Sequence, residues 1–142
     1  MPRLLIFLLM LITTPVWAQT QITWETLRDV RFTSRYHKEA GASYYVPHFG
    51  ASVKALEGKE VYLKGYMLPL LPEENMFILS SNPYSSCFFC GTGGPESIVE
   101  LRLKPGHPRF KMDQVVTIQG KLKLNQDDIN QCNYILDEAE VY

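Results

Sequence analysis

The sequence predicts a mostly β protein whose main unit is a small five-stranded barrel. Three observations lead to this prediction. From Lys59 onward apolar and polar residues alternate, the two longest alternating segments each carry a glycine on the inward face, and prolines separate the segments. Alternation with a period of two is the pattern of half-buried strands. A glycine inside a strand indicates a sharp bend, which the wall of a small barrel requires.

The first 18 residues have the pattern of a secretory signal peptide. Arg3 precedes an apolar run over residues 4–12, and Ala18 lies at the expected cleavage site. The run is too short to span a bilayer, and no later run of about 18 apolar residues follows it. No cysteine follows the run, so a bacterial lipoprotein anchor is not expected. We therefore expect an exported, soluble protein, periplasmic or secreted, with no stable membrane insertion after cleavage.

Charge and length narrow the class of protein further. Of the 14 Lys and Arg residues, Arg3 lies in the signal peptide, so 13 basic residues remain against 15 acidic residues. A near-neutral balance argues against a nucleic-acid partner, which requires a basic face. At this length a single domain is expected.

Residues 19–58 are expected to form an N-terminal extension that packs on the barrel. Between residues 23 and 45 the apolar residues follow no settled period. Farther on, Phe49, Val53 and Leu56 have the spacing of one face of a short helix. The extension is therefore predicted to contain a short helix and to lead into the main unit.

The barrel itself is expected over residues 59–142. The five predicted strands lie near residues 59–67, 76–81, 97–103, 116–124 and 134–141, and the first and fourth contain the inward glycines Gly65 and Gly120. Pro69 and Pro72 are expected to end the first strand, and Pro105 and Pro108 to break the chain after the third.

Five strands in about 85 residues fit a partly open barrel of the OB type. A five-stranded meander or a half-sandwich is the competing arrangement. In the OB arrangement the first three strands form a meander, the fourth pairs antiparallel with the first, and the fifth runs parallel to the third.

Three cysteines are the main candidates for a functional site. Cys87 and Cys90 lie in a loop of turn-forming residues between the second and third strands, and Cys132 immediately precedes the fifth strand. If the third and fifth strands are parallel, both begin at the same end of the barrel. The three sulfurs are then expected to share one site.

Three chemistries compete for this site. Cys87-x-x-Cys90-Gly has the form of a zinc knuckle, with Cys132 as third ligand and Glu96, a histidine or water as fourth. A structural disulfide, Cys87–Cys90 or one of these to Cys132, is expected for cysteines in an oxidising compartment. Thiol redox catalysis is the third, but such enzymes place the motif at a helix N-terminus, whereas strands flank it here.

Other polar motifs have ordinary structural explanations. Glu73-Glu74 and Asp127-Asp128 are carboxylate pairs in predicted turns, where solvated charges are the rule. No serine lies in a nucleophile-elbow motif. The sequence therefore predicts no enzyme.

The chain resembles a family of small exported bacterial proteins known only as a domain of unknown function with an OB-like barrel. The residues that carry the resemblance are Trp24-x-x-Leu27, Tyr45-x-Pro47-x-Phe49, Leu56-x-Gly58-Lys59-x-Val61-x-Leu63-x-Gly65-Tyr66-Met67-x-Pro69-Leu70, the cysteine loop, and Val116-x-Ile118-x-Gly120-x-Leu122. In the family that the chain resembles, some members are encoded near ABC-type permeases or in zinc-responsive clusters. The resemblance thus implies an accessory role in envelope transport or metal handling, with an envelope transport protein as partner and no catalytic residues. The Cys-Phe-Phe-Cys-Gly loop departs from the single-cysteine, proline-rich loop of other members.

Together these observations lead to three hypotheses. The first is a non-enzymatic, exported accessory protein of the bacterial envelope that binds zinc through Cys87, Cys90 and Cys132. The second is a disulfide-stapled module for protein interaction or ligand binding. The third is a thiol–disulfide oxidoreductase.

Overall fold

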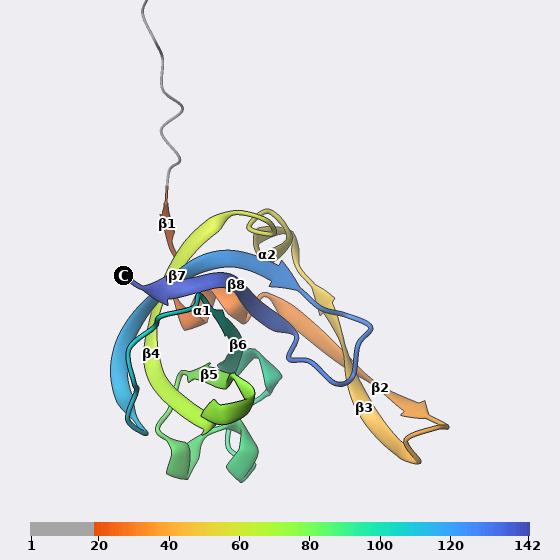
Figure 1. The fold of residues 1–142 in the computed structure, drawn as a ribbon. Helices are drawn as coiled ribbons and strands as arrows, with labels where there is room; N and C mark the ends of the chain where they lie inside the picture. The colour runs from red at the N-terminus through yellow and green to blue at the C-terminus, as the bar shows by residue number, and fades with distance from the viewer. Residues whose placement is uncertain (1–18) are drawn as a thin grey trace, which may run out of the picture.

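The structure is a computed structural model that describes residues 19–142, so the predicted signal peptide over residues 1–18 lies outside the described residues. Five strands form the barrel: β4 (Glu60–Leu71), β5 (Met76–Ser80), β6 (Ile98–Leu103), β7 (Gln114–Leu124) and β8 (Tyr134–Val141). The strands pair in the order β4-β5-β6-β8-β7, and β7 pairs back with β4 (Figure 1). The predicted fold class, a mostly β protein with a small five-stranded barrel, is confirmed, and the barrel is closed rather than partly open.

The strand directions are also those predicted. β4, β5 and β6 form an antiparallel meander, β7 is antiparallel to β4, and β8 is parallel to β6. One boundary differs from the prediction, because β4 continues through Pro69 to Leu71. The register between β4 and β5 shifts between these two residues. A bulge of this kind accommodates a proline within a strand.

The two inward glycines allow the strands to approach closely. A Cβ atom on Gly65 would lie 2.7 Å from the main-chain oxygen of Ser80 in β5, and one on Gly120 would lie 2.9 Å from that of Asp137 in β8. The register between β7 and β8 shifts opposite Gly120, where Glu138 has a φ of 51°. Any side chain at these two positions would push neighbouring strands apart.

Residues of the extension complete the main core. The core is built from the inward faces of the five strands together with four buried side chains of the extension: Ile22, Leu27, Phe49 and Val53. The Tyr134 hydroxyl, buried in this core, donates a hydrogen bond to the main-chain oxygen of Leu27 (2.7 Å).

Two short helices and one short strand lie in the extension. β1 (Thr20–Gln21) pairs parallel with β4, and α1 (Trp24–Leu27) begins at a capping box formed by Thr23 and Thr26. The indole of Trp24 donates a hydrogen bond to the main-chain oxygen of Lys64 in β4 (2.8 Å). α2 (Ala51–Lys54) is a single helical turn. Among residues 19–142 no helix has the length and apolar character needed to cross a bilayer.

A long hairpin between α1 and α2 was not predicted. β2 (Val30–His37) and β3 (Ala42–Phe49) pair antiparallel along their whole length and project from the side of the barrel (Figure 1). Beyond the base of the hairpin most side chains on both faces are exposed. A strand with two exposed faces has no buried face to impose a period of two, which explains why the sequence pattern was weak here.

Candidate functional site

The cysteine loop consists of short 3-10 turns. η2 (Tyr84–Ser86), η3 (Phe88–Cys90) and η4 (Pro95–Ser97) connect β5 to β6, and Gly91 ends η3 with a φ of 78°. The loop therefore forms a tight turn around Cys87, whose main-chain oxygen accepts hydrogen bonds from the N–H groups of Cys90 and Thr92.

The three cysteines are free and have different environments. Cys87 is buried, Cys90 is exposed and Cys132 is partly buried. Cys87 belongs to a small apolar cluster with Leu68, Ile78 and Ile98, and Cys132 packs against the same cluster. The parallel pairing of β6 and β8 thus brings Cys132 to the end of the barrel that carries the cysteine loop.

The surroundings of Cys90 and Cys132 favour the protonated form of these two thiols. The Cys90 thiol donates a hydrogen bond to the main-chain oxygen of Tyr84 (Sγ to O, 3.1 Å). Desolvation and the neighbouring Cys87 thiol raise the pKa of Cys90. Burial, and then the charge of Glu100, raise the pKa of Cys132 to about 12. Since the thiolate is the metal ligand and the nucleophile, neither environment activates sulfur at neutral pH.

The structure does not gather a metal-ligand set. Within residues 19–142, no group of three or more His, Cys, Asp or Glu side chains is arranged to hold a metal ion. Glu96, the candidate fourth ligand, lies near enough to Tyr134 for its charge to raise the pKa of that phenol, after the larger effect of burial. The zinc site at Cys87, Cys90 and Cys132 stays a prediction.

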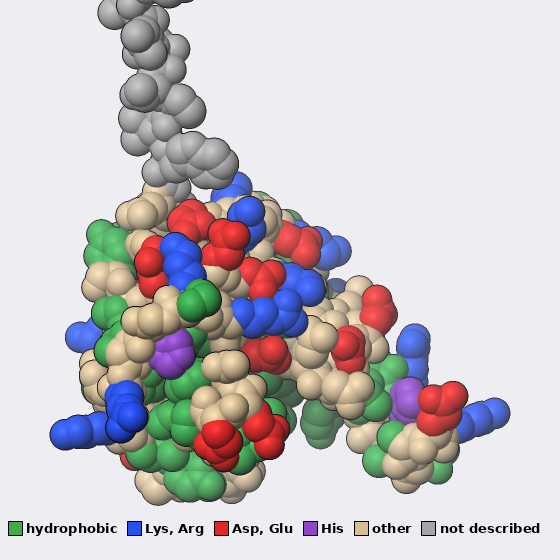
Figure 2. Space-filling model, viewed as in Figure 1, with side chains coloured by type: hydrophobic (Ala, Val, Ile, Leu, Met, Phe, Trp, Pro, Cys, Tyr) green, Lys and Arg blue, Asp and Glu red, His purple; other side chains and the backbone are tan. Residues whose placement is uncertain are grey.

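A cleft of about 570 Å³ lies beside the cysteine loop. One wall is strand β3 of the hairpin, with Tyr44 and Tyr45. The other walls are the β4–β5 turn, the loop that carries Phe88 and Phe89, the face of β5 and β6, and the β7–β8 loop. Figure 2 shows hydrophobic side chains gathered on the lower part of the barrel, and a hollow between that part and the hairpin. β5 and β6 are the second and third strands of the barrel, and the β4–β5 turn and the β7–β8 loop border the face that they form.

The lining of the cleft is apolar and acidic. Its apolar side chains are Tyr44, Tyr45, Leu70, Met76, Ile78, Phe88, Phe89, Pro95, Ile98 and Ile129. Its charged side chains are Glu74, Glu100 and Asp128, and none of the described residues that line it is a lysine or an arginine. The cleft therefore presents negative charge beside apolar surface.

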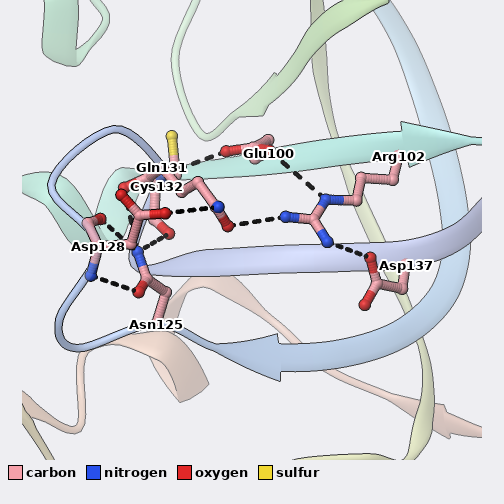
Figure 3. A network of polar contacts seen from close by, with 7 residues as sticks. All are labelled: Glu100, Arg102, Asn125, Asp128, Gln131, Cys132 and Asp137. Carbon is pink, nitrogen blue, oxygen red and sulfur yellow. Dashed lines mark hydrogen bonds and ion pairs between the residues drawn. The ribbon is translucent and has the colours of Figure 1, made fainter.

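A network of polar contacts holds the β7–β8 loop in place (Figure 3). The Asn125 amide donates hydrogen bonds to the main-chain oxygens of Asp128, Gln131 and Cys132. The Asp128 carboxylate accepts one from the Gln131 side chain (2.7 Å). The loop is thereby closed on itself and presents a fixed wall to the cleft.

The same network fastens the loop to the barrel. Arg102 of β6 donates to the Gln131 side-chain oxygen (2.7 Å) and pairs with Asp137 of β8 (3.1 Å). Its Nε lies 3.7 Å from Glu100, whose other carboxylate oxygen accepts the Cys132 N–H (3.1 Å). Glu100, which lines the cleft, thus connects Cys132 of the β7–β8 loop with Arg102 of β6.

The sequence pattern does not predict the cleft. It indicates only solvated turn charges at Glu74 and Asp128, and Tyr45 lies in the stretch without a settled period. These residues come from separate segments and meet only in the folded chain. One signal was available in principle, because the predicted OB arrangement assigns binding to this face and its two loops.

No protein-family model matches the chain, and no curated protein matches it either. Among solved structures the chain is similar to the crystal structure of a DUF3299 family protein from Pseudomonas aeruginosa PAO1, with 20% sequence identity and a TM-score of 0.55. The similarity covers 88% of this chain and 97% of that chain. At this identity the similarity shows a shared fold, and that family has no known function.

Proposed function

We propose that the protein is a non-enzymatic binding module of the bacterial envelope that receives a partner in the cleft beside the cysteine loop. The observation that supports this most is the lining of the cleft, where four large apolar side chains are left exposed: Tyr45 (60%), Met76 (44%), Phe89 (49%) and Ile129 (40%). Convergent exposed apolar side chains in a concave site are typical of binding surfaces. Export rests on the predicted signal peptide. The resemblance noted in the sequence suggests an envelope transport protein as partner.

Site-specific photocrosslinking in the producing cell tests this proposal. A photoreactive phenylalanine analogue replaces Met76 in the cleft, and a matched variant carries it at Met112, which is equally exposed (44%) but does not line the cleft. We expect a discrete adduct with an envelope protein from position 76 and none from position 112. Equal labelling at both positions, or no adduct at position 76, contradicts the proposal.

Zinc binding through Cys87, Cys90 and Cys132 is the second candidate, because Cys87 and Cys132 pack against one cluster and two of the three sulfurs therefore lie at the same end of the barrel. Metal analysis and thiol counting on one anaerobically purified sample test it. About one zinc per chain, lost in Cys132→Ser, supports a metal role. Metal-free protein with an intramolecular disulfide supports the stapled module instead. Turnover of insulin disulfides would indicate an oxidoreductase.

A further inference from the structure

We infer that the segment bound in the cleft is a cationic stretch of polypeptide in which lysine or arginine residues lie between apolar residues. This inference rests on the proposed binding function and specifies the chemistry of the partner. It is argued from the charge of the cleft, its apolar walls and its amide side chains.

The negative charge of the cleft is not neutralised from within. Glu74 and Asp128 form no ion pair with any other residue of the described chain. Arg102, which pairs with Glu100, is shared between Glu100 and Asp137 and does not line the cleft. One cation between two carboxylates leaves a net negative charge there, which favours a positive ligand.

The apolar walls suit the flanks of such a ligand. Tyr45 and Phe89 offer aromatic rings, whose faces attract ammonium and guanidinium groups. The aliphatic stems of lysine and arginine pack on apolar surface while their charged ends reach acidic groups. Met76 and Ile129 add flexible and aliphatic surface for neighbouring apolar side chains. A bare metal cation would use none of this surface.

Amide side chains in the walls suit a peptide backbone. Asn75 and Gln126 line the cleft, and within residues 19–142 their side-chain amides have no hydrogen-bond partner. Each such amide can both donate to a carbonyl and accept from an N–H group. Because the β7–β8 loop is already held by its own network, little order has to be imposed there when a peptide binds.

A pair of peptides that differ only in charge tests the inference. One nine-residue peptide alternates leucine and lysine, the other alternates leucine and glutamate, and both have blocked ends. Each is titrated into the purified exported protein while amide chemical shifts are followed by NMR. We expect shifts at cleft residues with the lysine peptide, no such shifts with the glutamate peptide, and weaker binding as salt is raised.

Two glutamate variants supply a matched control. Glu74 and Glu73 are adjacent and both exposed, but only Glu74 lines the cleft. We expect Glu74→Gln to weaken the binding of the lysine peptide about threefold, the size typical of one exposed charge pair, and Glu73→Gln to leave it unchanged. Tyr45→Ala, at a largely exposed site, should also weaken it.

Three outcomes would overturn the inference. The first is equal binding of the two peptides, the second is an equal effect of the two glutamate variants, and the third is a neutral oligosaccharide shifting the cleft resonances while the lysine peptide does not. Each of these leaves the proposed binding function standing if position 76 still forms its adduct. Loss of that adduct is the separate result that removes the proposed function.

Discussion

Replacing Gly65 by alanine tests the account of the barrel most directly. A Cβ atom at this position would lie 2.7 Å from the Ser80 oxygen, 2.9 Å from the Trp24 ring and 3.0 Å from Leu79. The Ser80 oxygen belongs to the paired backbone of β5, and Trp24 is held by its hydrogen bond to Lys64. Moving any of these three groups costs stability, so the added methyl group has to displace a strand or the indole.

Two opposing effects determine how much the free energy of unfolding falls in Gly65→Ala. Forcing an extra methyl into a packed core costs about 1–3 kcal/mol. Reducing the freedom of the unfolded chain by a Gly→Ala change returns about 0.4–1 kcal/mol. The difference spans about 0–2.6 kcal/mol, and the low end does not apply because the nearest atom is a main-chain oxygen at 2.7 Å. We therefore expect Gly65→Ala to lower the free energy of unfolding by about 1–2 kcal/mol, which corresponds to a drop of about 1 M in the urea midpoint for a small domain.

Urea unfolding followed by fluorescence measures this effect. Trp24 is the single tryptophan of residues 19–142, so its emission reports the contact between α1 and β4. Lys64→Ala, at the exposed neighbouring position, is the control and should leave the midpoint nearly unchanged. If Gly65→Ala unfolds at the same urea concentration as Lys64→Ala, the proposed close approach at Gly65 is wrong.

Two further predictions concern buried groups near the start of β8. Tyr134→Phe should destabilise the protein by about 1–2 kcal/mol in urea unfolding, because it leaves the buried Leu27 oxygen without its donor, whereas Tyr142→Phe at an exposed position should not. Stability should also fall as pH rises from 9 toward 12, since the Cys132 thiol ionises near 9 in the unfolded chain but near 12 in the folded protein. Comparing urea midpoints at pH 8, 9 and 10 checks this; an equally steep fall in Cys132→Ala would show that Cys132 is not responsible.

The barrel could be predicted because its strands have one buried face. Burial on one side of β4 and β7 imposes a period of two, and the two glycines mark where neighbouring backbones come close. Strand order then followed from a known arrangement of five strands, and the observed pairings agree with it. The hairpin β2–β3 could not be predicted in the same way, because most of its length has no buried face.

The candidate site was predictable only in part. The parallel pairing of β6 and β8 was enough to expect Cys132 near the cysteine loop. It does not determine where side chains point, and the structure places Cys87 inside an apolar cluster while Cys90 faces solvent. The cleft depends on Tyr45, Met76, Phe89 and Ile129, which lie far apart in sequence, so no local pattern could reveal it.

The two walls of the cleft differ in how they are held. The β7–β8 loop is closed on itself by the Asn125 contacts and tied to the barrel by Arg102, whereas the β2–β3 hairpin is a two-stranded ribbon whose strands, within residues 19–142, pair only with each other. Amide hydrogens in such a ribbon exchange with solvent faster than those of a closed barrel, because local opening there breaks few contacts. A ligand that bridges the ribbon and the barrel would slow this exchange, so the hairpin amides provide a built-in reporter of whether the cleft is occupied.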